Sequence, residues 1–198
     1  MRTTMFPILR TTLRLPATAL LLGLTLLLTQ TANSAEDAVA NPPGSIEFVG
    51  ENAIATANGV FHQWRIVEQS EPGTPLAERY AVVEIDLESV DTGINRRDDH
   101  LRDPDFFEVT RWPMATVKAH SLRAEEGVAG RFTARFDIDL HGVQKTLEGE
   151  VVVESESPLV LTGALVVDRL AFDVGPPTSR WNPMAVDAEI PVRFRIEL

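Results

Sequence analysis

The chain has 198 residues, no cysteine, and 29 acidic residues against 18 lysines and arginines, which gives a net charge of −11. So acidic a chain is poorly suited to nucleic acid, whose binding depends on neutralising phosphates with basic side chains. Without cysteine, a fold held together by disulfides is excluded as well.

Residues 1–34 have the pattern of a secretory signal peptide. Three arginines precede an apolar run at 17–28, and small polar residues follow it. The run is shorter than the roughly 20 apolar residues of a membrane-spanning helix. We therefore expect cleavage at the end of this segment, export to the periplasm, and no stable membrane insertion afterwards. Losing three of the 18 basic residues while all 29 acidic residues remain would leave a charge of about −14.

Residues 35–44 (AEDAVANPPG) are predicted to be a linker, and residues 45–198 one domain. Alternation of apolar and polar residues dominates that domain. It is clearest in RFTARFDIDL, where every second side chain is apolar, as in a half-buried strand. His141-Gly142 then predicts a tight turn and a hairpin. Strands are predicted at 45–49, 61–67, 80–88, 116–122, 131–140, 144–154, 159–167 and 190–198.

Eight antiparallel strands with one apolar face each predict either a sandwich or a barrel. We favour an all-β, eight-stranded barrel, because closure removes exposed strand edges. The interior of such a barrel is filled by side chains or holds one small ligand.

The charged segment NRRDDHLR at 95–102 predicts a short helix between two strands that covers one end of the barrel. Asp98 and Arg102 have the i, i+4 spacing of a favourable ion pair. Phe106 and Phe107 follow, and we expect both rings to turn inward.

Residues 85–119 (IDLESVDTGINRRDDHLRDPDFFEVTRWPMATVKA) resemble the core of the YceI-like family of exported isoprenoid-binding proteins. The family's further motifs follow in order as His141-Gly142-Val143, Asp168-Arg169 and Phe172-Asp173-Val174-Gly175. The resemblance covers about 44–198. It implies an extended lipocalin-like barrel whose apolar channel takes a long isoprenoid lipid, either a polyprenyl chain or an isoprenoid quinone, without another cofactor.

The alternation and the resemblance together predict which residues line that channel. The predicted wall residues are Val83, Ile85, Leu87, Phe132, Phe136, Ile138, Val151, Leu161, Leu165, Phe194 and Ile196. The predicted residues at its ends are Phe61, Trp64, Leu101, Phe106, Phe107 and Trp112. The alternative for each residue is ordinary core packing, since most inward aromatic side chains simply fill space.

Three short motifs suggest catalysis or metal binding but lack the required context. Asp91-Thr92-Gly93 occurs once, whereas an aspartic protease needs two carboxylates that share a proton. The adjacent residues of Asp98-Asp99-His100 point in different directions on a helix. Ser121 and Ser155 are not in a nucleophile elbow. We therefore predict no catalytic residue and no metal site.

The leading functional prediction is a non-enzymatic periplasmic binding or carrier protein for an isoprenoid lipid. A barrel enzyme or stress-response protein acting on a small hydrophobic substrate is the first alternative. A structural module whose barrel is filled by its own side chains is the second. The sequence leaves open whether two chains form a homodimer.

Overall fold

The computed structural model describes residues 42–177 and 185–198. The predicted signal peptide and most of the predicted linker lie outside the described residues. Within these ranges, no helix has both the length and the apolar character that crossing a membrane requires.

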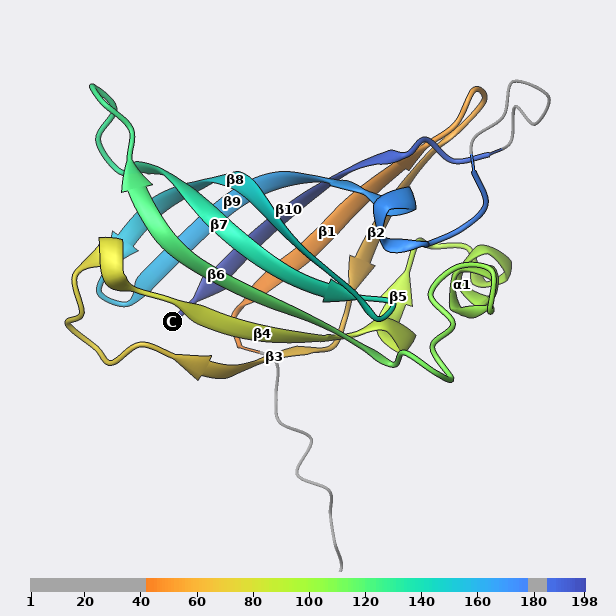
Figure 1. The fold of residues 1–198 in the computed structure, drawn as a ribbon, viewed down its shortest axis with the longest axis horizontal. Helices are drawn as coiled ribbons and strands as arrows, with labels where there is room; N and C mark the ends of the chain where they lie inside the picture. The colour runs from red at the N-terminus through yellow and green to blue at the C-terminus, as the bar shows by residue number, and fades with distance from the viewer. Residues whose placement is uncertain (1–41, 178–184) are drawn as a thin grey trace, which may run out of the picture. The chain divides into compact units, whose positions relative to one another are not determined.

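One antiparallel sheet forms the body of the domain and curls around a central space (Figure 1). Its order is β3-β4-β6-β7-β8-β9-β10-β1-β2-β5. The strands in the described ranges are β1 (Gly44–Glu51), β2 (Thr56–Phe61), β3 (Trp64–Gln69), β4 (Ala81–Asp86), β5 (Val90–Asp91), β6 (Met114–Ala124), β7 (Arg131–Leu140), β8 (Val143–Glu156), β9 (Leu159–Asp168) and β10 (Glu189–Glu197).

The two strands at the ends of this order belong to two bent chain segments that pair with each other. β2 continues into β3 through His62 and Gln63, and β4 continues into β5 through the 3₁₀ turn η2 (Leu87–Ser89). β2 pairs with β5, and β3 pairs with β4. Across the bends, the His62 amide donates to the Ser89 carbonyl at 3.2 Å and the Asp86 amide donates to the Gln63 carbonyl at 2.9 Å. The ten strands are therefore eight continuous segments in a ring.

This ring confirms the predicted eight-stranded barrel. The difference in strand number has a local cause, because each bend interrupts one continuous segment, and β5 lies beyond the end of the predicted strand 80–88. The predicted strand 61–67 crosses the first bend and so covers the end of β2 and part of β3. Alternation alone did not reveal either interruption.

Burial along β7 follows the predicted alternation. Ala134, Phe136 and Ile138 are buried, while Arg135 and Asp137 between them are exposed. The turn after β7 joins it to β8, as the hairpin prediction requires. His141 and Gly142 have φ values of 55° and 75°, the positive values that a two-residue hairpin turn demands.

The predicted helix is present as α1 (Asn95–Arg102), between β5 and β6. It lies near one end of the strands, beside β5 (Figure 1). The predicted ion pair between Asp98 and Arg102 is wrong, because Asp98 is buried and bonded to Thr92. Arg102 contacts Asp99 at 3.2 Å instead. We call this end of the barrel the α1 end.

Two further 3₁₀ turns lie at opposite ends of the strands. η1 (Leu76–Glu78) precedes β4, and η3 (Arg169–Phe172) follows β9. Figure 1 shows η1 and the C-terminus together at the end away from α1. We call that end the far end.

Candidate functional site

A cavity of about 570 Å³ lies inside the ring of strands. Apolar side chains from all eight continuous segments contribute to its wall. Sites for small molecules measure about 300–1,000 Å³, so this central cavity is large enough for a guest. The side chains of the described residues do not fill the interior.

Most of the residues predicted for the channel line the central cavity. They are Phe61, Val83, Ile85, Leu87, Leu101, Phe106, Phe107, Phe136, Ile138, Val151, Leu161, Leu165, Phe194 and Ile196. The alternation identified them because a period of two places alternate side chains on the inner face of a closed sheet. Their contact with a ligand stays a prediction.

Three predicted aromatic residues do not line the cavity. Trp64 is 4% exposed and packs in a core cluster with residues of β4 and β6. Trp112 lies against the β7–β8 turn, where a Cβ on Gly142 would stand 2.5 Å from its ring. Phe132 is half-buried against the core cluster that includes other β7 residues. Their size and apolarity indicated burial, but not that they would pack among neighbours instead of facing open space.

The lining also contains apolar residues that the sequence analysis did not select. They include Ile46, Phe48, Ala81, Ala115, Val117, Ala119, Leu122, Val174 and Val192. Ala115, Val117 and Ala119 are spaced by two along β6, so the alternation there held the missing signal. Their small side chains leave more of the interior open than leucine or phenylalanine would.

Two glycines let aromatic rings lie against the barrel wall. A Cβ on Gly59 would stand 2.2 Å from Phe48 Cζ, and one on Gly163 would stand 2.3 Å from Phe194 Cζ. Each pair is directly cross-strand. The rings therefore cover the neighbouring backbone, where a larger residue would push them away from the wall.

At the α1 end, a threonine joins a buried carboxylate to an arginine. Asp98, 4% exposed, accepts a hydrogen bond from the Thr92 amide at 2.9 Å and a second, short one from the Thr92 hydroxyl. Arg97 Nε donates to Thr92 Oγ1 and Arg97 Nη2 donates to the Thr92 carbonyl, both at 2.7 Å. Thr92 and Arg97 line the central cavity. The loop and the first turn of α1 thus hold one guanidinium at the cavity wall.

Arg169 is the second arginine of the cavity lining, and it is 4% exposed. It donates to four backbone carbonyls, those of Val174 at 2.7 Å, Pro176 at 2.9 Å, Val186 at 2.6 Å and Asp187 at 3.0 Å. Burial lowers the pKa of its guanidinium, while the charges of nearby aspartates oppose that shift. An arginine remains protonated under ordinary conditions, so the cation is retained inside the domain.

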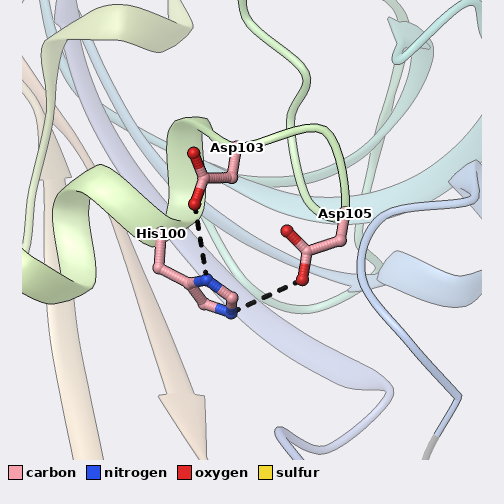
Figure 2. A group of neighbouring side chains, drawn as sticks. All are labelled: His100, Asp103 and Asp105. Carbon is pink, nitrogen blue, oxygen red and sulfur yellow. Dashed lines mark ion pairs between the residues drawn. The ribbon is translucent and has the colours of Figure 1, made fainter.

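His100 also lines the cavity and has a carboxylate beside each ring nitrogen, as Figure 2 shows. Asp103 Oδ2 is 3.7 Å from Nδ1, and Asp105 Oδ2 is 3.6 Å from Nε2. This is the candidate metal cluster of the described residues. However, a metal ion binds one imidazole nitrogen at about 2.0–2.1 Å, and the two carboxylates lie at opposite nitrogens. The arrangement suits separate contacts of the imidazole with two carboxylates better than a shared metal ion.

The Asp-Thr-Gly turn has the surroundings of a surface turn. The Asp91 side chain is 46% exposed and its Oδ2 is 2.9 Å from His62 Nε2, while the Gly93 amide donates to its Oδ1 at 2.7 Å. The hydrogen bond with His62, followed by that from Gly93, lowers the pKa of Asp91. A shared-proton carboxylate dyad would instead raise one pKa, so this turn lacks the electrostatics of an aspartic protease.

A second hollow of about 280 Å³ lies at the far end. Its lining contains Arg79 and Tyr80 together with residues of the turn before η1 and of the β8–β9 turn. We call it the far hollow. Its lining shares five residues with that of the central cavity, namely Ala81, Ala119, Leu122, Leu161 and Leu198. The two spaces are therefore neighbours along the barrel.

Residues 38–198 match the family model of the YceI-like domain. Protein YceI from Shigella flexneri is 34% identical over 86 residues, which make up 42% of this chain and 43% of that protein. The matched segment thus spans less than half of this relative.

Two solved structures share the fold. BcnA from Burkholderia cenocepacia superposes with a TM-score of 0.67 at 22% identity, over 78% of this chain and 96% of that one. A polyisoprenoid binding domain from Saccharophagus degradans has a TM-score of 0.59 at 20% identity, over 79% and 94% of the two chains. At these identities the likeness establishes the fold alone.

Proposed function

This chain belongs to the YceI-like family, and from that premise we propose that it binds a long isoprenoid lipid inside its barrel. The bound molecule is either a polyprenyl chain or the tail of an isoprenoid quinone. The protein acts as a carrier or store that keeps this tail out of water.

The apolar central cavity is the observation that carries the proposal. A prenyl tail has no charge along its length, so its affinity must come from the removal of its methyl and methylene groups from water. Each buried CH₂ contributes about 0.8 kcal/mol, and one five-carbon unit about 4 kcal/mol before the costs of association. Aliphatic and aromatic side chains around 570 Å³ offer such a tail the surface it needs.

The domain from Saccharophagus degradans is a polyisoprenoid binding domain, which supports the same class of ligand for this chain. The N-terminal signal pattern supports a site of action in the periplasm.

We propose a non-enzymatic role. Among the described residues, the ionisable side chains of the cavity lining are Glu51, Arg97, His100 and Arg169. A catalytic site usually pairs a nucleophile or base with a group that orients it. Arg97 and Arg169 are instead held by threonine and backbone groups, and His100 lies between two exposed aspartates.

Extraction of the purified protein with organic solvent, followed by mass spectrometry, tests the proposal. We expect a prenyl lipid close to one per protein. The extracted protein should then take up an isoprenoid quinone or a prenyl alcohol, and the recovered lipid should be chemically unchanged. Absence of any lipid in the extract, together with failure of the stripped protein to bind either probe, would overturn the proposal. Recovery of an altered lipid would favour the enzyme alternative.

A further inference from the structure

We propose that Ser121, on the outer face of β6, is a modification site that takes an acyl group from an activated ester or thioester. The site lies outside the central cavity, and this inference goes beyond the proposed function. Its basis is a chain of hydrogen bonds that runs from Ser121 through His120 to Asp137.

A β-bulge places Ser121 beside the side chain of His120. Neighbouring residues of a regular strand point to opposite faces of the sheet, so two adjacent side chains do not meet there. In β6 the register with β7 shifts between His120 and Arg123, and Ser121 has a φ of 55°. This left-handed conformation is uncommon for a residue other than glycine, and a bulge re-aims the side chain that it carries. Ser121 is exposed as a result, while Leu122 after it is buried.

The hydrogen bonds have the order of a nucleophile, a base and a group that orients the base. Ser121 Oγ is 2.8 Å from His120 Nδ1, and His120 Nε2 is 3.0 Å from Asp137 Oδ2. When the Nε2 proton is donated to the carboxylate, Nδ1 is an acceptor and can take the hydroxyl proton. The two ring nitrogens have exchanged roles relative to the serine proteases, but such an arrangement is recognised by geometry and not by sequence context.

Asp137 is held as a carboxylate. Thr146 Oγ1 donates to Asp137 Oδ1 at 2.6 Å, which leaves Oδ2 for the histidine. The hydrogen bond from Thr146 lowers the pKa of Asp137, as do the charges of His120 and Lys118, whereas desolvation opposes the shift. An ionised carboxylate at this place keeps a proton on Nε2 and stabilises the imidazolium that forms when Nδ1 takes another.

The surroundings decide what kind of acyl donor can react. Arg135 is the cross-strand partner of His120. Arg135 and Arg123 lie 3.8 and 2.7 Å from the carboxylate of Glu148 and so have a negative partner already. Because Ser121 is exposed, water solvates the oxyanion that develops on the acyl carbonyl. One donor of an enclosed oxyanion hole contributes about 10²–10³-fold in rate, so a donor with a good leaving group is needed here.

The modification is a single acyl transfer. Ser121 Oγ forms a bond to the acyl carbon while His120 Nδ1 accepts the hydroxyl proton. The bond from the acyl carbon to the leaving oxygen or sulfur breaks, and the proton passes from Nδ1 to that atom. The products are an acyl-serine and a free alcohol or thiol. Asp137 positions the ring and does not touch the donor.

The test treats the purified protein with para-nitrophenyl acetate and locates the acetyl groups by peptide mass spectrometry. We expect acetylation of Ser121 to be at least about 10-fold faster than that of the exposed Ser157, since general-base assistance contributes about 10²–10⁴-fold in enzymes. His120→Gln should remove this advantage. Asp137→Asn should reduce it and Asp137→Glu should restore part of it, which a merely structural role of Asp137 would not produce.

His62→Gln is the matched control, because His62 Nε2 also has a carboxylate beside it, that of Asp91 at 2.9 Å. This variant should leave the acetylation of Ser121 unchanged. Wild-type protein in which Ser121 reacts no faster than Ser157 would overturn the inference, and so would a His120→Gln variant that reacts like the wild type. Neither result bears on the proposed function, which the extraction of lipid from the cavity tests separately.

Discussion

The α1 end and the far end of the barrel differ in their charged residues. At the α1 end, Arg97 and Arg169 are held by neutral groups, so positive charge persists beside the cavity. At the far end, Arg79 donates to the Thr74 carbonyl at 2.6 Å and shares the hollow with acidic residues. A guest with one polar end therefore has two unequal ways to lie in the barrel.

The two ends also differ in what limits the length of a guest. α1 and its following turn cover one end with Leu101, Phe106 and Phe107. Toward the far end, Ala81 and Ala119 are cross-strand partners that border both the central cavity and the far hollow. Small side chains there leave space for a tail to continue. The two ends would therefore limit a guest of the proposed kind unequally.

A substitution in the middle of the barrel, between the two ends, should have the largest effect on stability. Phe136 is 2% exposed and lines the central cavity. Phe136→Asp would bury a carboxylate without a partner and should cost about 4 kcal/mol or more, a large fraction of the stability of a typical domain. Urea denaturation measures this loss. The control Arg135→Asp faces outward on the same strand and should change stability by less than about 1 kcal/mol. Wild-type stability of Phe136→Asp would reverse the assignment of the strand's faces.

Replacement of Asp98, the buried carboxylate at the α1 end, should have the second largest effect on stability. Asp98→Ala leaves the Thr92 amide and hydroxyl without their acceptor, which should cost about 2–3 kcal/mol. Urea denaturation of the variant and of the wild-type protein measures this loss. Asp99→Ala is the control, since it removes an exposed pair with Arg102 that contributes little. Similar effects of the two variants would mean that the network does not organise this end.

The sequence predicted the walls of this barrel better than its ends, for a physical reason. Strands expose alternate residues to one face, so RFTARFDIDL indicates both the strand and the inward position of Phe136. The bend at His62 and Gln63 depends on bonds to Ser89 and Asp86, which no local pattern records.

The polar residues of the α1 end were missed for a related reason. Arg97 belongs to a charged run that also contains the exposed Arg96 and Asp99, so composition could not separate the cavity residue from its neighbours. Its position follows from the bonds to Thr92, which form only when the loop and helix fold together. Aromatic type was equally insufficient, since Trp64 and Trp112 are large and apolar but do not line the cavity.

The far end offers a test of tail length. Ala119→Phe adds a ring between the central cavity and the far hollow. We expect affinity for a 40-carbon prenyl alcohol to fall about 10-fold, the loss of roughly two buried CH₂ groups, while a 20-carbon alcohol binds nearly as before. Competition between the two alcohols measures the ratio. Thr116→Phe, a change on β6 outside the cavity lining, should leave the ratio unaltered. No loss for either length would place the whole tail at the α1 end, and an equal loss for both would mean that the ring disturbs the whole cavity.

Local stability at the two ends should respond to pH in opposite directions. This is the smallest of the expected effects, and it distinguishes the two ends most selectively. The hydrogen bond with His62, then that from Gly93, lowers the pKa of Asp91 at the α1 end. Because the pKa of Asp91 is lower in the folded state, its ionisation stabilises the fold at pH values above the ordinary aspartate pKa. This contribution is lost as the pH falls through the pKa of the folded state. The hydrogen bond to Glu68 raises the pKa of Tyr80 at the far end. The contribution of the Tyr80 hydrogen bond to stability is complete at pH values below the ordinary tyrosine pKa. It is lost as the pH rises through the higher pKa of the folded state.

Both pairs are exposed, so we expect local loosening without global unfolding. Amide hydrogen exchange, corrected for its intrinsic pH dependence, should show protection falling around β5 below about pH 4 and around β4 above about pH 10. Tyr80→Phe should abolish the alkaline response and leave the acid response in place. If both ends loosened at the same extreme of pH, these hydrogen bonds could not be the cause, and net charge repulsion over the whole domain would explain the change instead.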